Sequence, residues 1–196
     1  MLVHIVYAHP SGDSFTHSLL EAFVAGLDEA GHPHTVSDLY AMDFNPVLSS
    51  DEYARESSYA ADRPIPQEVA AEQAKLDAAD GWAFVYPVWW SDVPAILKGW
   101  FDRVWTVGWA YHPSNLSRAR KALALCAAGH TVEQLRETGL YQSMRAVMLA
   151  DRVFDRADAK QFHLFDGSEA MTGDEWQRAR QRHLQQAHKL GREIGA

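Results

Sequence analysis

Residues 85–105 read VYPVWWSDVPAILKGWFDRVW. An apolar run ends at Pro87, two adjacent tryptophans follow, and Pro94 opens a segment rich in aromatic side chains. The pattern predicts a buried strand, a short loop and then a helix, because proline is well tolerated in the first turn of a helix. Loops run over the protein surface and often carry function. An adjacent Trp pair in such a loop therefore indicates a wall for a flat ligand.

Short apolar runs alternate with helical patterns along the chain. One helix face is predicted by the four-residue spacing of Phe15, Leu19, Phe23 and Leu27, and Gly31 is placed to end that helix. A second helix is expected over about 67–79, with an inner stripe of Val69, Gln73, Leu76 and Ala79. A final helix is expected from Gly173-Asp174, with Asp174 as its cap, to about Ile194. Strands are expected at residues 2–8, 35–39, 82–86, 122–127 and 162–165.

This alternation predicts a single α/β domain over residues 1–196. Near-continuous apolar strands separated by helices are typical of a parallel sheet that is covered by helices on both faces. Five strands favour the doubly wound order 2-1-3-4-5, in which ligands bind at the carboxyl ends of the strands near strands 1 and 3. The two loops of most unusual composition follow these strands. We therefore expect the functional site at that edge.

The composition excludes several classes of function. The net charge is −8 and the basic residues are dispersed, which argues against a nucleic-acid partner, because such binding needs clustered Lys and Arg. No run approaches the roughly 18 apolar residues of a membrane span, and the N-terminus lacks the basic segment of a secretory signal. The single cysteine, Cys126, lies in an apolar strand and is expected to be an inert core thiol. We expect a cytoplasmic protein.

The loop after the first strand reads His9-Pro10-Ser11-Gly12-Asp13-Ser14-Phe15-Thr16. It leads into a helix N-terminus, whose free N–H groups and dipole favour an anion. One interpretation is a phosphate site to which the hydroxyls of Ser11, Ser14 and Thr16 add donors, and His9 adds a donor or a charge. In the other, Asp13 or Ser14 only caps the helix and His9 only satisfies a backbone group. The Gly-rich fingerprints of dinucleotide and nucleoside-triphosphate sites are absent.

Two more loops are expected at the same edge. After the third strand, the N–H groups of Val88, Trp89 and Trp90 are expected to face the rim of a flat ring such as flavin, while the tryptophans pack on its face. Alternatively, the Trp pair closes the core or a subunit contact. Residues 127–131, after the fourth strand, read AAGHT, where Gly129 lets the backbone approach a ligand and His130 suits proton chemistry near neutral pH.

The remaining patterns point to no particular chemistry. The ten histidines are scattered, and pairs such as His32/His34 and His183/His188 lack the usual metal-ligand spacings, so no metal site is expected. Asp151-Arg152 and Asp155-Arg156 are interpreted as solvated charge on a helix or loop. No G-x-S-x-G elbow is present, so nothing supports serine-hydrolase chemistry.

Three segments resemble a known family, the NAD(P)H:quinone oxidoreductases, which are the diaphorase branch of the flavodoxin-like flavoproteins. The segments are Val93–Val104, which follows the Trp pair, Ser37–Pro46 and Ala71–Asp80. The likeness covers roughly residues 2–130 and implies a flavodoxin-like fold. The corresponding cofactor is FAD, with FMN as the alternative.

The resemblance also implies which residues bind the cofactor. The flavin phosphate and ribityl chain correspond to His9, Ser14, Phe15 and Thr16, and the isoalloxazine ring to Pro87, Val88, Trp89 and Trp90. The family's Thr-Gly-Gly turn after the fourth strand is replaced here by Ala127-Ala128-Gly129-His130, so the facing cofactor-binding residues are Ala128, Gly129 and His130.

Substrate-site residues follow from the same resemblance. Trp109, Ala110 and Tyr111 match an aromatic element that family dimers contribute across their interface, which implies a homodimer with shared active sites. His130 and Tyr141 are the catalytic candidates for proton or charge management, because Gln134 and Leu140 nearby lack suitable chemistry.

The expected activity is the two-electron reduction of quinones or related electrophiles by NAD(P)H, in ping-pong order, with the flavin supplying the hydride chemistry. Two other functions remain open. One is a non-catalytic regulatory subunit of a potassium-efflux system, and the other is a one-electron carrier similar to flavodoxin.

Overall fold

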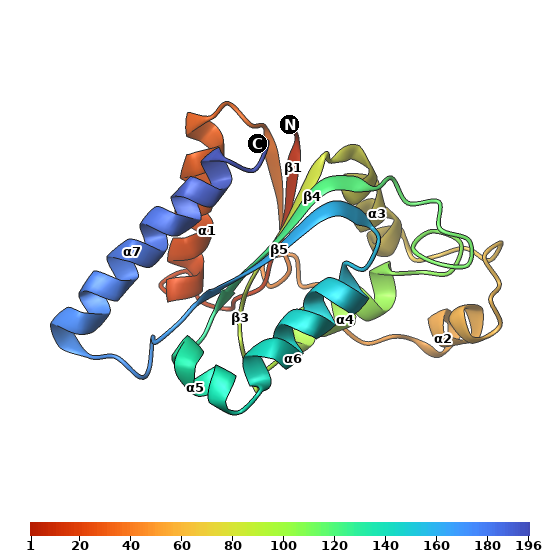
Figure 1. Cartoon of the computed structure of the whole chain (residues 1–196). Helices are drawn as coiled ribbons and strands as arrows, with labels where there is room; N and C mark the ends of the chain where they lie inside the picture. Colours follow the sequence, from red (N-terminus) through yellow and green to blue (C-terminus); the bar gives the residue numbers. More distant parts are fainter.

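Five parallel strands form the central sheet of the computed structural model, which describes residues 1–196 (Figure 1). The strands are β1 (Val3–Tyr7), β2 (His34–Asp38), β3 (Gly81–Pro87), β4 (Ala119–Ala127) and β5 (Ala157–Phe165). Their order is β2-β1-β3-β4-β5, and every neighbouring pair is parallel. The predicted α/β class and the predicted strand order are confirmed.

Strands β4 and β5 begin earlier than the sequence predicted, at Ala119 and Ala157 rather than at residues 122 and 162. Residues 158–161 read DAKQ and are exposed, because β5 is the last strand of the sheet. An edge strand needs no continuous apolar run, and charged residues there discourage pairing with another chain. Apolar runs therefore reveal only the inner end of β5.

Helices cover both faces of the sheet (Figure 1). On one face, α1 (Phe15–Glu29) and α7 (Gly173–Arg192) lie side by side. The other face is covered by α3 (Gln67–Ala78), α4 (Ala95–Val104), α6 (Leu140–Ala146) and the π-helix η1 (Val147–Arg152). None of the helices combines the length and the apolar character that crossing a membrane requires.

Four further helical segments are not predicted from the sequence. These are α2 (Ser50–Ser57), α5 (Val132–Glu137), α6 and η1. All four are short, and a run of six to eight residues gives too little periodicity to be recognised. The expected Asp174 cap of α7 is also wrong, because Asp174 lies in the first turn and its helix has no side-chain cap.

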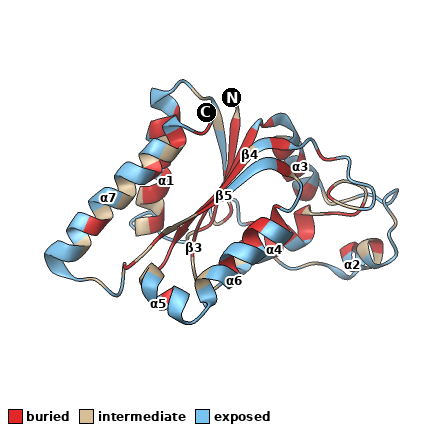
Figure 2. Ribbon diagram, in the orientation of Figure 1, coloured by how far each residue is buried: buried red, intermediate tan, exposed pale blue.

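Two apolar cores, one on each face, hold the layers together. Figure 2 shows the buried residues concentrated on the strands and on the helix faces turned toward them. Leu19, Phe23 and Leu27 of the predicted α1 stripe are fully buried on the α1/α7 face. Burying a side chain of this kind contributes roughly 1.5–3 kcal/mol. Cys126 is also fully buried, and burial raises the pKa of its thiol, as expected of an inert core cysteine.

The predicted end of α1 is confirmed in detail. Gly31 has a φ of +68°, in the left-handed region that glycine adopts without strain. The N–H groups of Gly31 and His32 donate to the carbonyl oxygens of Asp28 and Leu27, at 3.1 and 2.9 Å. This is the Schellman motif, which satisfies carbonyl groups that the end of a helix would otherwise leave free.

Helices α1 and α7 contact each other through two glycines. A Cβ atom on Gly26 would lie 2.0 Å from the carbonyl oxygen of His188, and one on Gly191 would lie 2.1 Å from that of Phe23. Real Cβ atoms do not approach so closely, so only glycine fits at either position. The two helix backbones therefore pack directly against each other.

A fully buried carboxylate, that of Glu72 in α3, joins three elements on the opposite face. Its Oε1 accepts hydrogen bonds from the Ser37 hydroxyl of β2 at 3.0 Å and from Lys75 Nζ at 2.5 Å. Its Oε2 accepts one from Trp100 Nε1 of α4 at 3.0 Å. A buried charge is tolerated only when it is paired and hydrogen-bonded in this way.

His4 of β1 extends this network inside the sheet. Its Nδ1 lies 2.8 Å from the Thr35 hydroxyl and its Nε2 lies 3.3 Å from the Ser37 hydroxyl. Burial lowers the pKa of His4 from 6.5 to about 4; the Glu72 carboxylate opposes this shift and the Lys75 ammonium adds to it. The folded protein therefore keeps a neutral imidazole at pH values where an unfolded chain is protonated.

We predict that this neutral histidine makes the protein less stable in mild acid. Because the pKa is lowered by folding, its contribution is complete above pH 6.5 and is lost as the pH falls from 6.5 toward 4. One proton corresponds to a slope of at most about 1.4 kcal/mol per pH unit. Urea unfolding across this range should show that the His4→Gln variant lacks this part of the slope. Equal slopes in the two proteins would contradict the assignment.

Candidate active site

Four backbone hydrogen bonds close the carboxyl edge of the sheet, one residue beyond the strands. In each bond a backbone N–H donates to a carbonyl oxygen of the neighbouring strand at 2.7–3.0 Å. The pairs are Leu39 to Tyr7, Ala8 to Val85, Val88 to Ala127, and Ala128 to Phe165. These bonds link β2 to β1, β1 to β3, β3 to β4 and β4 to β5. The loops after β1, β3 and β4 therefore leave the sheet side by side.

In the loop after β1, the side chains already have partners in the protein. The Ser14 hydroxyl caps α1 by accepting the N–H of His17 at 3.0 Å, and His9 Nδ1 accepts the N–H of Ser11 at 3.0 Å. The structure therefore agrees with the capping interpretation: Ser14 caps the helix and His9 satisfies a backbone group. Burial lowers the pKa of His9, against the effect of its bond to Ser11.

The backbone of this loop keeps its capacity for an anion. The N–H groups of Gly12, Ser14, Phe15 and Thr16 donate to no other group of the protein. They lie at the N-terminus of a 15-residue helix, where the helix dipole favours negative charge. The phosphate interpretation therefore rests on backbone donors rather than on the hydroxyl of Ser14.

After β3, residues 89–92 form a tight two-residue hairpin, which we call the Trp turn. Trp89 and Asp92 exchange two backbone hydrogen bonds, at 3.0 and 3.1 Å. Between them, Trp90 and Ser91 have φ values of +53° and +61°. Positive φ at both central positions is the type I′ geometry, which favours Asn-Gly. A larger residue in this conformation costs about 1 kcal/mol or more.

This turn corrects one expectation about backbone donors. The N–H of Val88 donates to Ala127 and that of Trp89 donates to Asp92, so neither is free to face a ligand. Of these three expected donors, only the N–H of Trp90 has no partner in the protein. The indole of Trp90 is fully exposed at the tip of the turn, whereas Trp89 is partly covered.

Arg152 of η1 anchors the Trp turn, which corrects a second expectation. The sequence pattern of Asp151-Arg152 favours solvated charge, but Arg152 is buried. Its Nη1 and Nη2 bind Oδ1 and Oδ2 of Asp92 at 2.7 and 3.1 Å. Burial would raise the pKa of Asp92, but the Arg152 guanidinium and the Val93 N–H hold it below its ordinary value.

The turn after β4 faces the Trp turn. The N–H of Ala128 is used by Phe165, but those of Gly129 and His130 donate to no group of the protein. Their carbonyl oxygens accept N–H groups of residues 167, 169 and 170, so this loop fixes the turn from outside. A Cβ on Gly129 would lie 2.7 Å from the Glu169 carboxyl group, so a larger residue here would displace the exposed Glu169 side chain.

A cavity of about 660 Å³ lies between these two turns. This volume is within the range of small-molecule and cofactor sites, about 300–1,000 Å³. Of the residues that the sequence analysis selected, it is lined by Val88, Trp89, Trp90, Ala128, Gly129 and His130. Further lining residues are Ser91, Gln134, Leu135, Glu137, Thr138, Leu140 and Glu169.

The β1 loop approaches the same cavity. The imidazole of His9 lies 6.0 Å from the ring of Trp89, measured between centroids. Phe15 is half-buried and packs edge-on against Trp176 of α7 at 4.9 Å. Thr16 is buried within α1, and Pro87 is buried as the last residue of β3. The three predicted loops therefore meet, with His9 beside the cavity and Phe15 on the α7 side.

The remaining four selected residues, like Pro87 and those of the β1 loop, do not line this cavity. Tyr141 packs edge-on against Phe162 and beneath the guanidinium of Arg136, although its neighbour Leu140 lines the cavity. Trp109, Ala110 and Tyr111 lie beyond α4; the first donates its indole N–H to Asp77 at 2.8 Å. Ala110 is buried, and its carbonyl accepts Arg156 Nε at 3.2 Å.

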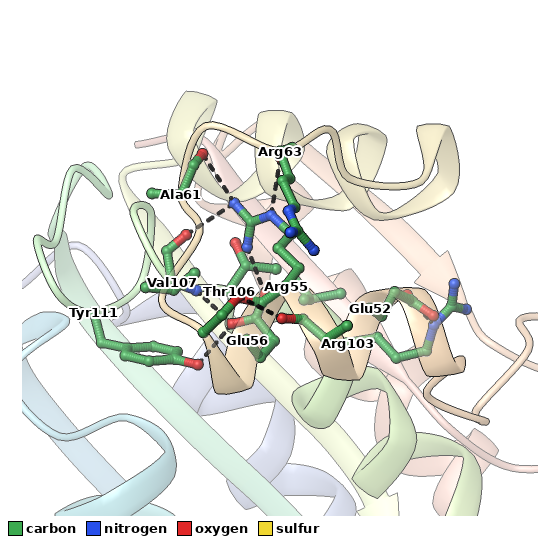
Figure 3. Close-up of polar contacts among 12 residues, drawn as sticks. Glu52, Arg55, Glu56, Ala61, Arg63, Arg103, Thr106, Val107 and Tyr111 are labelled. Carbon is green, nitrogen blue, oxygen red and sulfur yellow. Dashed lines mark hydrogen bonds and ion pairs between the residues drawn. The ribbon is translucent and has the colours of Figure 1, made fainter.

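Tyr111 is held by a carboxylate from α2 (Figure 3). Its hydroxyl donates to Glu56 Oε2 at 2.6 Å, and the same oxygen accepts the N–H of Val107 at 2.7 Å. Arg55 pairs with Glu56 and donates to the carbonyl oxygens of Ala61, Arg63 and Val107. Burial and the Glu56 bond raise the pKa of Tyr111, so its hydroxyl stays protonated.

The missed lining residues carry one signal in the sequence. Thr131 and Gln134 form a capping box, in which each side chain bonds the other's backbone N–H, at 3.3 and 2.9 Å. This Ser/Thr-x-x-Glu/Gln pattern marks a helix start. It identifies α5 and therefore places Gln134, Leu135 and Thr138 close to the turn after β4. Glu169 has no such signal, because it reaches the cavity from a loop beyond β5.

The family model described as a flavodoxin-like fold matches residues 1–190. A solved structure named NAD(P)H:quinone oxidoreductase, from Methanothermobacter marburgensis, superposes with a TM-score of 0.93 at 46% identity, covering 100% of this chain and 96% of that one. This chain belongs to the NAD(P)H:quinone oxidoreductase family, within the flavodoxin-like fold. The predicted family is therefore confirmed.

Curated relatives agree with this assignment. Ribosyldihydronicotinamide dehydrogenase (quinone) of Pongo abelii is 38% identical over 161 residues, which are 73% of this chain and 70% of that protein. NAD(P)H dehydrogenase (quinone) 1 of Rattus norvegicus is 42% identical over 120 residues, 55% of this chain but only 44% of that protein. The chain thus spans less than half the length of the rat relative.

We predict that the contact between Tyr111 and Glu56 stabilises the segment that follows α4. Replacing Tyr111 by Phe removes one donor from a largely buried carboxylate, and we expect a loss of about 1–2 kcal/mol in the free energy of unfolding. Chemical denaturation measures this loss. Tyr53→Phe is the matched control, because Tyr53 is exposed and its hydroxyl makes no bond. A loss of the same size in both variants would contradict the assigned role.

Proposed function

We propose that this protein is a flavin-dependent NAD(P)H:quinone oxidoreductase that reduces quinones or related electrophiles by two electrons. The observation that carries the proposal is the 660 Å³ cavity with the Trp turn on one side and residues 128–130 on the other. Its place at the carboxyl edge of β3 and β4, next to the loop after β1, is where doubly wound sheets bind ligands. The names of the relatives favour this class of reaction over a regulatory subunit or an electron carrier.

The residues present fit a flavin. The indoles of Trp89 and Trp90 offer flat apolar surface, and the N–H groups of Gly129 and His130 offer donors opposite them. Beside His9, the free N–H groups at the start of α1 suit a phosphate. In our proposal FAD is the cofactor and FMN is the alternative, since both carry the ring and the first phosphate.

A bound flavin supplies the ring that accepts a hydride from NAD(P)H and passes it to the acceptor. The protein's own contribution is binding, orientation and charge. The Trp turn binds flat rings and excludes water from them. The N–H groups of Gly129 and His130 stabilise negative charge that develops beside them. Both substrates use the same cavity in turn, which gives the ping-pong order.

His130 is the proposed proton-handling residue, because it lines the cavity and is exposed to solvent. Tyr141 is the second proposed proton-handling residue; it does not line the cavity itself, but its neighbour Leu140 does. Trp109, Ala110 and Tyr111 serve a second copy of the chain in a homodimer, which is consistent with their place outside this chain's own cavity. We propose a cytoplasmic location, supported by the single buried cysteine.

The proposed function predicts a bound flavin that NAD(P)H reduces. Heating the purified chain should release FAD or FMN, which chromatography distinguishes, and any apoprotein should bind added FAD or FMN. Stopped-flow mixing with NADH or NADPH should bleach the flavin absorbance, and a quinone should restore it. A chain that binds neither flavin, or whose flavin neither nucleotide reduces, would refute the proposal.

Trp90→Ala tests the role of the Trp turn in binding. Because Trp90 is fully exposed, the stability should change by no more than about 0.5 kcal/mol. Loss of one aromatic face should raise the KM for a quinone about tenfold. Trp90→Phe is the control, since it keeps a ring at the tip and should retain most of the affinity. An unchanged KM in the alanine variant would remove Trp90 from the binding site.

A further inference from the structure

We propose that the ion pair between Arg152 and Asp92 holds the Trp turn in its strained conformation and thereby fixes the tryptophan wall of the cavity. Arg152 is then a positioning residue: it does not line the cavity itself, but it binds the residue that ends the turn. The effect on the turn does not depend on the proposed function. Only the consequence for quinone binding rests on the proposed function.

The turn needs an external support because its sequence disfavours its shape. Trp90 and Ser91 both have positive φ, which is sterically unfavourable for residues with a Cβ atom. Only two backbone hydrogen bonds close the hairpin. A two-residue hairpin of this size is not stable alone in water. Trp90 contributes no packing, since its side chain is fully exposed. Trp89 packs only against His9, so the strongest contact from the turn to the rest of the protein is that of Asp92, the one turn residue with a charged partner.

Arg152 is itself fixed on several sides. Its guanidinium lies 5.4 Å from the ring centroid of Phe101 in α4. Its carbonyl oxygen accepts the indole N–H of Trp105, just after α4, at 2.7 Å. Both Nη atoms bind Asp92, in the two-point geometry that gives an Arg–carboxylate pair its directionality. Asp92 Oδ1 also accepts the N–H of Val93 at 2.7 Å, so the carboxylate cannot rotate freely.

The residue that binds Asp92 ends the π-helix. Arg152 is the last residue of η1, and a π-turn changes where the residues at its end point. Single π-turns inside helices occur frequently at functional sites. Here the segment brings a buried cation under a loop that is 60 residues away in sequence. Arg152 thus joins α4, η1 and the Trp turn through direct contacts.

The test uses hydrogen exchange at the turn itself. In Arg152→Met, the amides of Trp89 and Asp92 should exchange about tenfold faster, because each is protected only by the hairpin. Adding Ser91→Gly to this variant should restore most of the protection, since glycine accepts positive φ without strain. The control Arg103→Met removes another buried arginine, paired with Glu52, and should leave these two amides unchanged.

Kinetics supply the second readout. If the quinone binds at this cavity, Arg152→Met should raise its KM about fivefold with kcat changed less than twofold, and Ser91→Gly should reverse the rise. If Arg152→Met does not fold, Arg152→Lys replaces it, because lysine keeps the charge but loses the two-point contact. In that variant the amides of Trp89 and Asp92 should exchange faster than in the unchanged protein, by less than about tenfold. Unchanged exchange in the folded variant, or no rescue by Ser91→Gly, would overturn the proposal. The exchange measurement needs neither flavin nor quinone, so it stands even if the proposed activity fails.

Discussion

The carboxyl edge of the sheet is the constraint on which the site depends. Each strand but the last continues one residue beyond its end to bind its neighbour, so the edge closes with a row of backbone hydrogen bonds from β2 to β5. These bonds consume the N–H groups of Val88 and Ala128. The next residues are then forced out of the sheet, where the N–H groups of Trp90, Gly129 and His130 remain available to a ligand.

Features that depend on local sequence could be predicted. The strand order follows from the alternation of strands and helices, and the end of α1 follows from Gly31, whose conformation is a property of one residue. The convergence of the three loops follows from topology alone. For the same reason the sequence identified six residues that line the cavity, since all lie within three residues of a strand end.

Features that depend on distant partners could not be predicted. Arg152 has the same local pattern as a solvated residue, and its burial is decided by Asp92 and Phe101, which lie far from it in sequence. The N–H groups of Val88 and Trp89 were expected to be free because a sequence does not show which backbone donors a turn uses. The predicted β5 is too short for a related reason: residues 158–161, in its first half, are polar because they border solvent.

The two glycines between α1 and α7 have a consequence for how the chain is made. Gly26 contacts the backbone of the final helix, so the surface that α1 presents there has no counterpart until the last residues are synthesised. Domains generally fold as units, and long-range contacts of this kind form slowly. During translation the first helix therefore gains its packing partner last, and a chain that stops before α7 leaves the Gly26 side of α1 uncovered.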